Sequence, residues 1–126
     1  MKIFVEGSKR SAIARLFPAW KKLGHQIVET PQKADVQLAV IRIRNKTGLP
    51  VVLRLDGVYY DMGRNYKQSN SSIGKSHHKA DAVIYQSECS KAMCERYLAK
   101  RTTDIFQVVH NGIDPTVGII FKNIKV

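Results

Sequence analysis

The chain has 126 residues, 44% of them hydrophobic and 25% charged, which fits one ordinary globular domain and excludes a disordered chain. No run approaches the roughly 18 apolar residues of a transmembrane helix, and no signal peptide is evident at Met1–Gly7. The net charge of +11 favours anionic partners such as phosphates, nucleic acid or an acidic membrane face.

The first third of the chain predicts a strand, a turn and a helix. Residues 2–5 form a short apolar strand, and Glu6-Gly7-Ser8 supply the turn. Residues 9–23 then have helical periodicity, and Pro18 falls on the polar face, where a kinked helix survives. Gly24 is expected to cap its end. The apolar side comprises Ala12, Ile13, Leu16, Phe17, Ala19, Trp20 and Leu23.

The middle of the chain predicts three more strands, over residues 25–28, 35–43 and 51–55. A polar loop, 44–48, separates the last two. The segment 56–65 carries glycines and turn-forming polar residues, which is typical of a functional loop.

The last part continues the alternation with a polar helix over 66–79, a strand over 82–85, a helix over 88–99 capped by Ser87, and a strand over 105–109. The pair His77-His78 is expected to lie on the solvated surface of the first of these helices. Cys89 and Cys94, five apart on one helix, point about 140° apart, so we expect two reduced thiols and a cytoplasmic protein.

Continuous apolar strands that alternate with helices predict an α/β fold, a Rossmann-like doubly wound parallel sheet in a single domain over residues 1–114. Residues 115–126 are expected to be a tail or the start of a linker. In such sheets ligands bind outside the carboxyl ends of the strands, which places Gly7-Ser8, Asp56-Gly57 and Asn111-Gly112 on one rim.

Two stretches of this rim suggest binding. The turn at Gly7 opens a helix whose free N–H groups could hold a phosphate, although the composition favours a plain turn capped by Ser8. Arg54 interrupts an apolar strand, and Asp56 lies on the same side two residues on. The pair either pins the strand end or presents Asp56 to sugar hydroxyls, with Tyr59 or Tyr60 stacking on a ring.

The sequence shows no motif for metal binding or for a nucleophilic hydrolase. No cluster of His, Cys and carboxylates has metal-ligand spacing, and no G-x-S-x-G motif is present. The basic, apolar helix 9–23 has the composition to lie on an anionic membrane, but packing on the sheet explains it better. Its basic back remains compatible with a peripheral membrane contact.

Residues 54–61, Asn65-Tyr66, Ile73, 80–91 and 108–114 together resemble a bacterial and viral branch of the retaining family 4 glycosyltransferases, which have the GT-B fold. The resemblance covers about residues 50–114. It implies an N-terminal domain that mainly binds a glycan or lipid-linked acceptor, and a second domain that binds the nucleotide-sugar donor. No other cofactor is implied.

The resemblance also implies site residues. Asp56-Gly57 occupies the place of a cleft loop after the fourth strand, which suggests Asp56 as a catalytic residue, and Gly7 matches a glycine loop near the donor phosphates. Asn111 begins a block similar to the exit into the interdomain linker. Together with the rim residues described above, the residues expected to bind acceptor or donor in the cleft are Gly7, Ser8, Arg54, Gly57, Tyr59, Asn65 and Asn111.

The chain departs from this pattern after Asp114, because only twelve residues follow and the paired Glu of the donor domain have no counterpart. We therefore expect a glycosyltransferase half that is inactive alone, either a truncated gene product or one subunit of a split enzyme with a separate donor-binding subunit. The alternative is a non-catalytic module that binds an anionic glycan, a lipid headgroup or, less well supported, nucleic acid.

Overall fold

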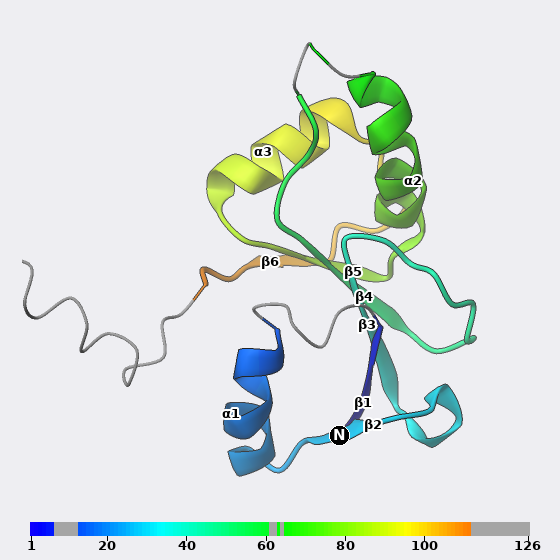
Figure 1. Cartoon of the computed structure of the whole chain (residues 1–126), viewed down its shortest axis with the longest axis vertical. Helices are drawn as coiled ribbons and strands as arrows, with labels where there is room; N and C mark the ends of the chain where they lie inside the picture. Colours follow the sequence, from blue (N-terminus) through cyan, green and yellow to red (C-terminus); the bar gives the residue numbers. More distant parts are fainter. Residues whose placement is uncertain (7–12, 61–62, 64, 112–126) are drawn as a thin grey trace, which may run out of the picture.

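The computed structural model describes residues 1–6, 13–60, 63 and 65–111. Its centre is one sheet of six parallel strands in the order β2-β1-β3-β4-β5-β6 (Figure 1). The strands are β1 (Lys2–Glu6), β2 (Gln26–Val28), β3 (Val36–Val40), β4 (Val51–Leu55), β5 (Ala82–Tyr85) and β6 (Phe106–Val108). The α/β fold with a parallel, Rossmann-like sheet is therefore confirmed.

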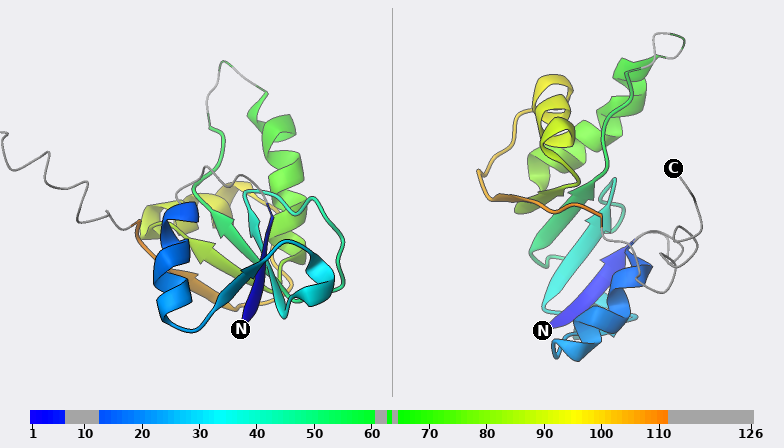
Figure 2. Two further views of the ribbon diagram at one scale, coloured as in Figure 1. Left: turned by 60° about the horizontal axis from the view of Figure 1, so that its bottom comes forward. Right: turned by 90° about the vertical axis from the view of Figure 1, so that its left-hand side faces the viewer.

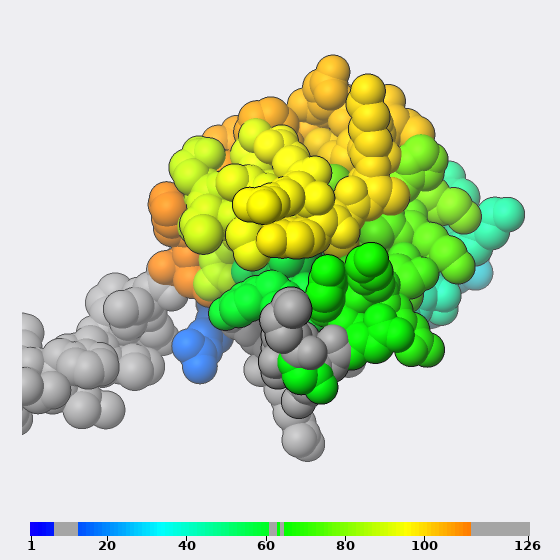
Figure 3. Space-filling view, turned by 90° about the horizontal axis from the view of Figure 1, so that it is seen from above, coloured from blue at the N-terminus to red at the C-terminus, as the bar shows by residue number. Residues whose placement is uncertain are grey.

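Three α-helices pack on the sheet, α1 (Phe17–Lys22) on one face and α2 (Tyr66–Lys79) with α3 (Glu88–Tyr97) on the other. Figure 2 shows the two layers on either side of the strands, and Figure 3 shows α3 and α2 side by side. Two short 3₁₀ turns, η1 (Ala14–Leu16) and η2 (Pro31–Lys33), complete the regular elements of the described residues. Helices on both faces bury the apolar strands from water.

The apolar core divides in two along these faces, because successive strand residues point to opposite sides. Beneath α2 and α3 the buried set is Ala39, Leu53, Leu55, Ile73, Ala80, Val83, Tyr85 and Cys94. Beneath α1 it is Ile3, Ile13, Leu38 and Val40. At Gly74 the helix α2 lies close to the segment after α3, and a Cβ there would lie 3.4 Å from the backbone nitrogen of Ala99, at the limit of ordinary van der Waals contact.

The first helix differs from the prediction. Pro18 occupies the first turn of α1, where its missing N–H has no intrahelical partner to lose, so the α-helix begins at Phe17, just before Pro18, instead of bending there. Ile13 packs on the sheet, but Leu23 is 73% exposed, since the helix ends before it. Gly24, at φ 85°, closes the helix as predicted: its N–H donates to Lys21 O, and the N–H of His25 donates to Trp20 O.

Strand β3 is shorter than its apolar run of residues 35–43. Ile41 has φ 68°, and the N–H of Arg42 donates to Val40 O at 2.8 Å, so the chain makes a tight three-residue turn. A left-handed conformation at a β-branched residue stores strain of about 1–3 kcal/mol. The turn directs residues 42–49 back across the sheet.

Glu6 belongs to β1 and not to the turn that we predicted after it. Its side chain is buried, and its carboxylate accepts hydrogen bonds from the backbone N–H groups of Arg44 and Asn45 and from Gln37 Nε2 at 2.6 Å. A buried carboxylate needs such partners. Glu6 therefore fastens the loop 42–49 over the part of the sheet that α2 and α3 leave uncovered.

Candidate functional site

The carboxyl end of β4 carries a buried arginine. Leu53 and Leu55 are fully buried under α2 and α3, so the alternation of the strand directs Arg54 to the opposite face. Arg54 is only 6% exposed. A guanidinium removed from water to this extent needs hydrogen-bond acceptors.

Two side chains supply these acceptors. Arg54 Nη1 donates to Asp56 Oδ1 at 2.7 Å, and Arg54 Nη2 donates to Asn111 Oδ1. The predicted pair of Arg54 and Asp56 is therefore confirmed. The contact with Asn111 spans 57 residues of sequence and brings the end of β4 together with the segment after β6.

The cluster of Arg54, Asp56 and Asn111 stays open to solvent on one side. The Asp56 side chain is 49% exposed, and its Oδ2 accepts no hydrogen bond from any described residue. Because Arg54 can only donate, the amide oxygen of Asn111 faces it and the Nδ2 group points away. The same guanidinium thus orients one acceptor and one donor that no described residue engages, at the carboxyl rim of the sheet.

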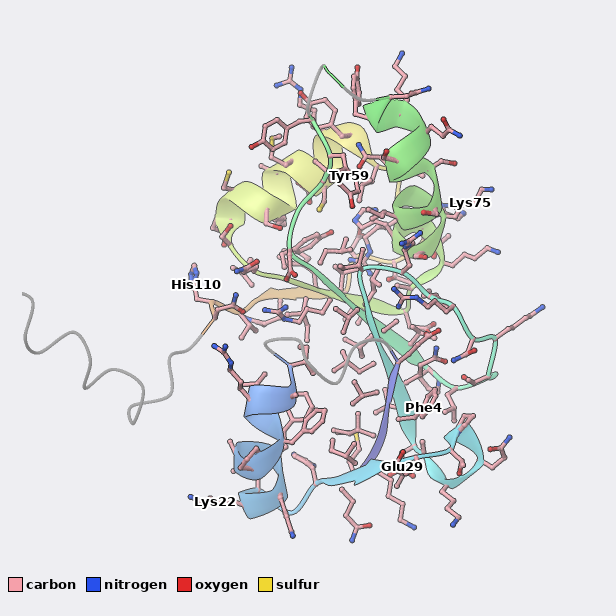
Figure 4. The ribbon with its side chains drawn as sticks, in the orientation of Figure 1. Phe4, Lys22, Glu29, Tyr59, Lys75 and His110 are labelled. Carbon is pink, nitrogen blue, oxygen red and sulfur yellow. The ribbon has the colours of Figure 1, made fainter. Side chains whose placement is uncertain are left out.

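The other predicted site residues are not part of this cluster. The backbone N–H and C=O of Tyr59 pair with the side-chain amide of the buried Asn70, at 2.9 and 2.7 Å, so the loop at Tyr59 is held against α2 (Figure 4). Asn65 caps α2, since its Oδ1 accepts from the N–H of Gln68 at 3.2 Å. Beside Gly57 the space is open, with no heavy atom within 4 Å of a hypothetical Cβ. Gly7 and Ser8 lie outside the described residues.

One residue that we did not select stands next to the cluster. His110 is exposed and projects outward from the end of β6, directly before Asn111 in the chain (Figure 4). In the sequence, His110 was marked only by its place in the block 108–114 that follows the last predicted strand. Its position makes it a rim residue available to a bound molecule.

A second polar cluster lies on the opposite face and corrects the prediction for His77. His77 is 2% exposed, not solvated, and its Nδ1 lies 2.9 Å from Ala99 O while its Nε2 lies 2.8 Å from the Tyr85 hydroxyl. A carbonyl can only accept, so Nδ1 carries a proton, and in the neutral imidazole Nε2 then accepts from the Tyr85 hydroxyl. His78, the neighbour, is exposed as predicted.

Burial sets the protonation of this second cluster. Desolvation lowers the pKa of His77 below its usual 6.5, and the nearby Arg101 acts in the same direction. Burial likewise raises the pKa of the Tyr85 hydroxyl above 10. Both groups are therefore neutral near pH 7, which fixes the direction of their mutual hydrogen bond from the Tyr85 hydroxyl to His77 Nε2.

Three further features were checked in the part of the chain that the structure describes: metal-ligand groups, the two cysteines and helices that could span a membrane. No group of three His, Cys, Asp or Glu side chains is placed to hold a metal ion. Cys89 and Cys94 are unpaired, as predicted, and burial raises the pKa of the Cys94 thiol to about 11. None of the described helices has the length and apolar character to cross a membrane.

We compared the chain with protein-family models, curated proteins and solved structures, and it matches none of them.

Proposed function

We propose that this chain is the acceptor-binding half of a two-domain glycosyltransferase, and that the rim cluster of Arg54, Asp56 and Asn111 holds the acceptor. The observation that supports this most is the exposed carboxylate beside an exposed amide N–H, both oriented by one buried guanidinium. Sugar hydroxyls donate and accept hydrogen bonds at once, so neighbouring hydroxyls fit such a pair. The resemblance of residues 50–114 to family 4 glycosyltransferases supports the same function.

In this proposal each residue has a distinct role. Asp56 Oδ2 accepts the hydrogen bond of the attacking acceptor hydroxyl, and Asn111 Nδ2 donates to a neighbouring oxygen. Arg54 is a positioning residue, because it touches the two side chains and not the sugar. During transfer the bond between the anomeric carbon and the donor phosphate breaks, a bond to the acceptor oxygen forms, and the hydroxyl proton leaves toward Asp56 or the departing phosphate.

The donor nucleotide-sugar would be held by a second domain on another polypeptide or elsewhere in a longer chain. Transfer requires donor and acceptor to be fixed in one geometry, which contributes much of the rate enhancement of such enzymes. We therefore expect little or no transfer from a hexose nucleotide by the 126-residue chain alone. Donor-dependent transfer by the purified chain would contradict this division between an acceptor-binding and a donor-binding domain.

Acceptor binding can be tested without the donor. We would titrate a panel of methyl hexosides and follow binding by saturation-transfer NMR. Asp56→Asn and Asn111→Ala are expected to weaken the best ligand about tenfold or more, as removal of a hydrogen bond to a charged or fixed group does. Asp104→Asn, an exposed carboxylate before β6, is the matched control and should change affinity less than about twofold.

The outcome separates the two hypotheses of the sequence analysis. Equal affinities of the Asp56→Asn and Asp104→Asn variants, or no binding of any hexoside, would remove the acceptor role. In that event the alternative function, a non-catalytic module that binds an anionic ligand through its positive charge, becomes the better description of the chain.

A further inference from the structure

A groove of about 540 Å³ lies between the loop 43–49 and the outer side of α2. Four of its lining residues are cationic, namely Arg44 and Lys46 on the loop and Lys75 and Lys79 on α2, and one, Asp81, is acidic. Figure 4 shows Lys75 projecting outward from α2. The loop follows β3, the strand beside β4, but Glu6, which fastens it, lies on the face of the sheet opposite to Arg54.

Both walls of the groove are attached to the sheet before any ligand binds. The Glu6 carboxylate fixes the backbone at Arg44 and Asn45, as described above. The N–H of Ile43 donates to Ser76 Oγ at 2.9 Å, and Ser76 in turn donates to Ser72 O at 3.1 Å, which joins the loop to α2. A preformed groove loses little conformational entropy on binding.

The positive charge of the groove is not neutralised by ion pairs among the described residues. No described carboxylate lies within salt-bridge distance of any of the four cations. Asp81 Oδ2 accepts the backbone N–H of Val51 at 2.8 Å, so it serves the start of β4. Lys75 and Lys79 are four apart on one helix and repel each other. The helix dipole favours Lys79 at the C-terminus, but it gives no reason for Lys46 on the loop.

We propose that this groove binds the phosphate group of a phosphate ester. Ammonium and guanidinium groups recognise phosphate oxygens through charge-assisted hydrogen bonds, and the Ser72 hydroxyl at the edge of α2 adds a neutral donor. The volume lies in the usual range for small-ligand sites. Aromatic side chains, on which the bases of single-stranded nucleic acid stack, are missing from its lining. The site does not depend on Asp56 or on glycosyl transfer.

The test compares two variants of equal charge. In the first, Lys46, Lys75 and Lys79 are all replaced by alanine; in the second, the exposed Lys22, Lys33 and Lys67 are replaced. Calorimetric titration with inorganic pyrophosphate at low salt should show a dissociation constant at least about tenfold higher for the groove variant, and a change under about threefold for the control. Amide NMR shifts on titration should map to residues 43–49 and 72–79 of the wild-type chain.

Three results would overturn the proposal: no pyrophosphate binding, equal losses in both variants, or NMR shifts elsewhere. Circular dichroism of both variants shows whether a loss of binding comes from unfolding. We expect both to be folded, because substitutions of exposed lysines change stability little. The source of the phosphate is decided with phosphatidylcholine vesicles that contain phosphatidic acid. Vesicle binding that only the groove variant loses identifies a lipid headgroup. Pyrophosphate binding without vesicle binding identifies a soluble ester, and either result supports the site.

Discussion

Two polar clusters lie on opposite faces of the same sheet and differ in how far their hydrogen bonds are satisfied. His77 and Tyr85 are 2% and 1% exposed, and the protein itself supplies the partners of both imidazole nitrogens. Arg54 is nearly as buried, but its partner Asp56 has a side chain that is 49% exposed. A closed cluster, whose hydrogen bonds are all made within the protein, contributes to stability. An open cluster, which is partly exposed, keeps hydrogen-bonding atoms available to a ligand.

This comparison predicts that the closed cluster affects stability most. His77→Ala should lower the free energy of unfolding by about 2–4 kcal/mol, because it leaves a cavity and removes the partners of Ala99 O and the Tyr85 hydroxyl. Urea denaturation measures the loss. His78→Ala, at the exposed neighbouring position, should cost less than about 1 kcal/mol. Similar losses in the two variants would show that the His77 cluster is not a structural centre.

Tyr85→Phe should have the next largest effect. The substitution keeps the ring that packs against Phe106 and removes the hydroxyl that donates to His77 Nε2. An unsatisfied buried nitrogen costs about 1–2 kcal/mol. The midpoint of urea denaturation measures this cost, and Tyr97→Phe, at an exposed ring on α3, is the control. An unchanged midpoint for Tyr85→Phe would mean that water replaces the hydroxyl.

In the open cluster of Arg54, Asp56 and Asn111, a substitution should affect binding more than stability. Asp56→Asn is expected to lower the free energy of unfolding by about 1 kcal/mol or less, since the site is half exposed and the amide oxygen still accepts from Arg54. Its effect on hexoside binding, about tenfold, should be much larger than this. Denaturation and binding measured on the same sample separate the two effects. A large loss of stability with unchanged binding would assign Asp56 to the pinning of β4.

The smallest expected effect is on the pH dependence of the free energy of unfolding. Because burial lowers the pKa of His77, the unfolded chain binds more protons than the folded one at pH values between the folded pKa and 6.5. The contribution of His77 to stability is therefore complete above pH 6.5 and is lost as the pH falls through the folded pKa. Urea midpoints measured from pH 7.5 downward should fall less steeply for His77→Gln than for the wild type or His78→Gln. Equal slopes would indicate that His77 is accessible to protons in the fold.

Local patterns were sufficient for most of the elements. Strands 51–55 and 82–85 and the helix 66–79 have the predicted bounds, and the Ser87 hydroxyl oxygen accepts from the N–H of Ser90 at 3.0 Å, as a cap should. Apolar runs, caps and turn glycines act within a few residues, so they can be read in one dimension. Pro18 misled the prediction because a proline that bends a helix and one that begins a helix have the same letter pattern.

The sequence by itself thus determined the class of fold, the order of its elements and the pair of Arg54 and Asp56, since two residues on one strand side are a local relation. Only the tertiary structure decided that Asn111 joins this pair, that His77 is buried and that the loop cations face those of α2. These three outcomes depend on which strands are neighbours and how the chain crosses the sheet. Burial and long-range contact come from that packing, and no pattern within one segment encodes them.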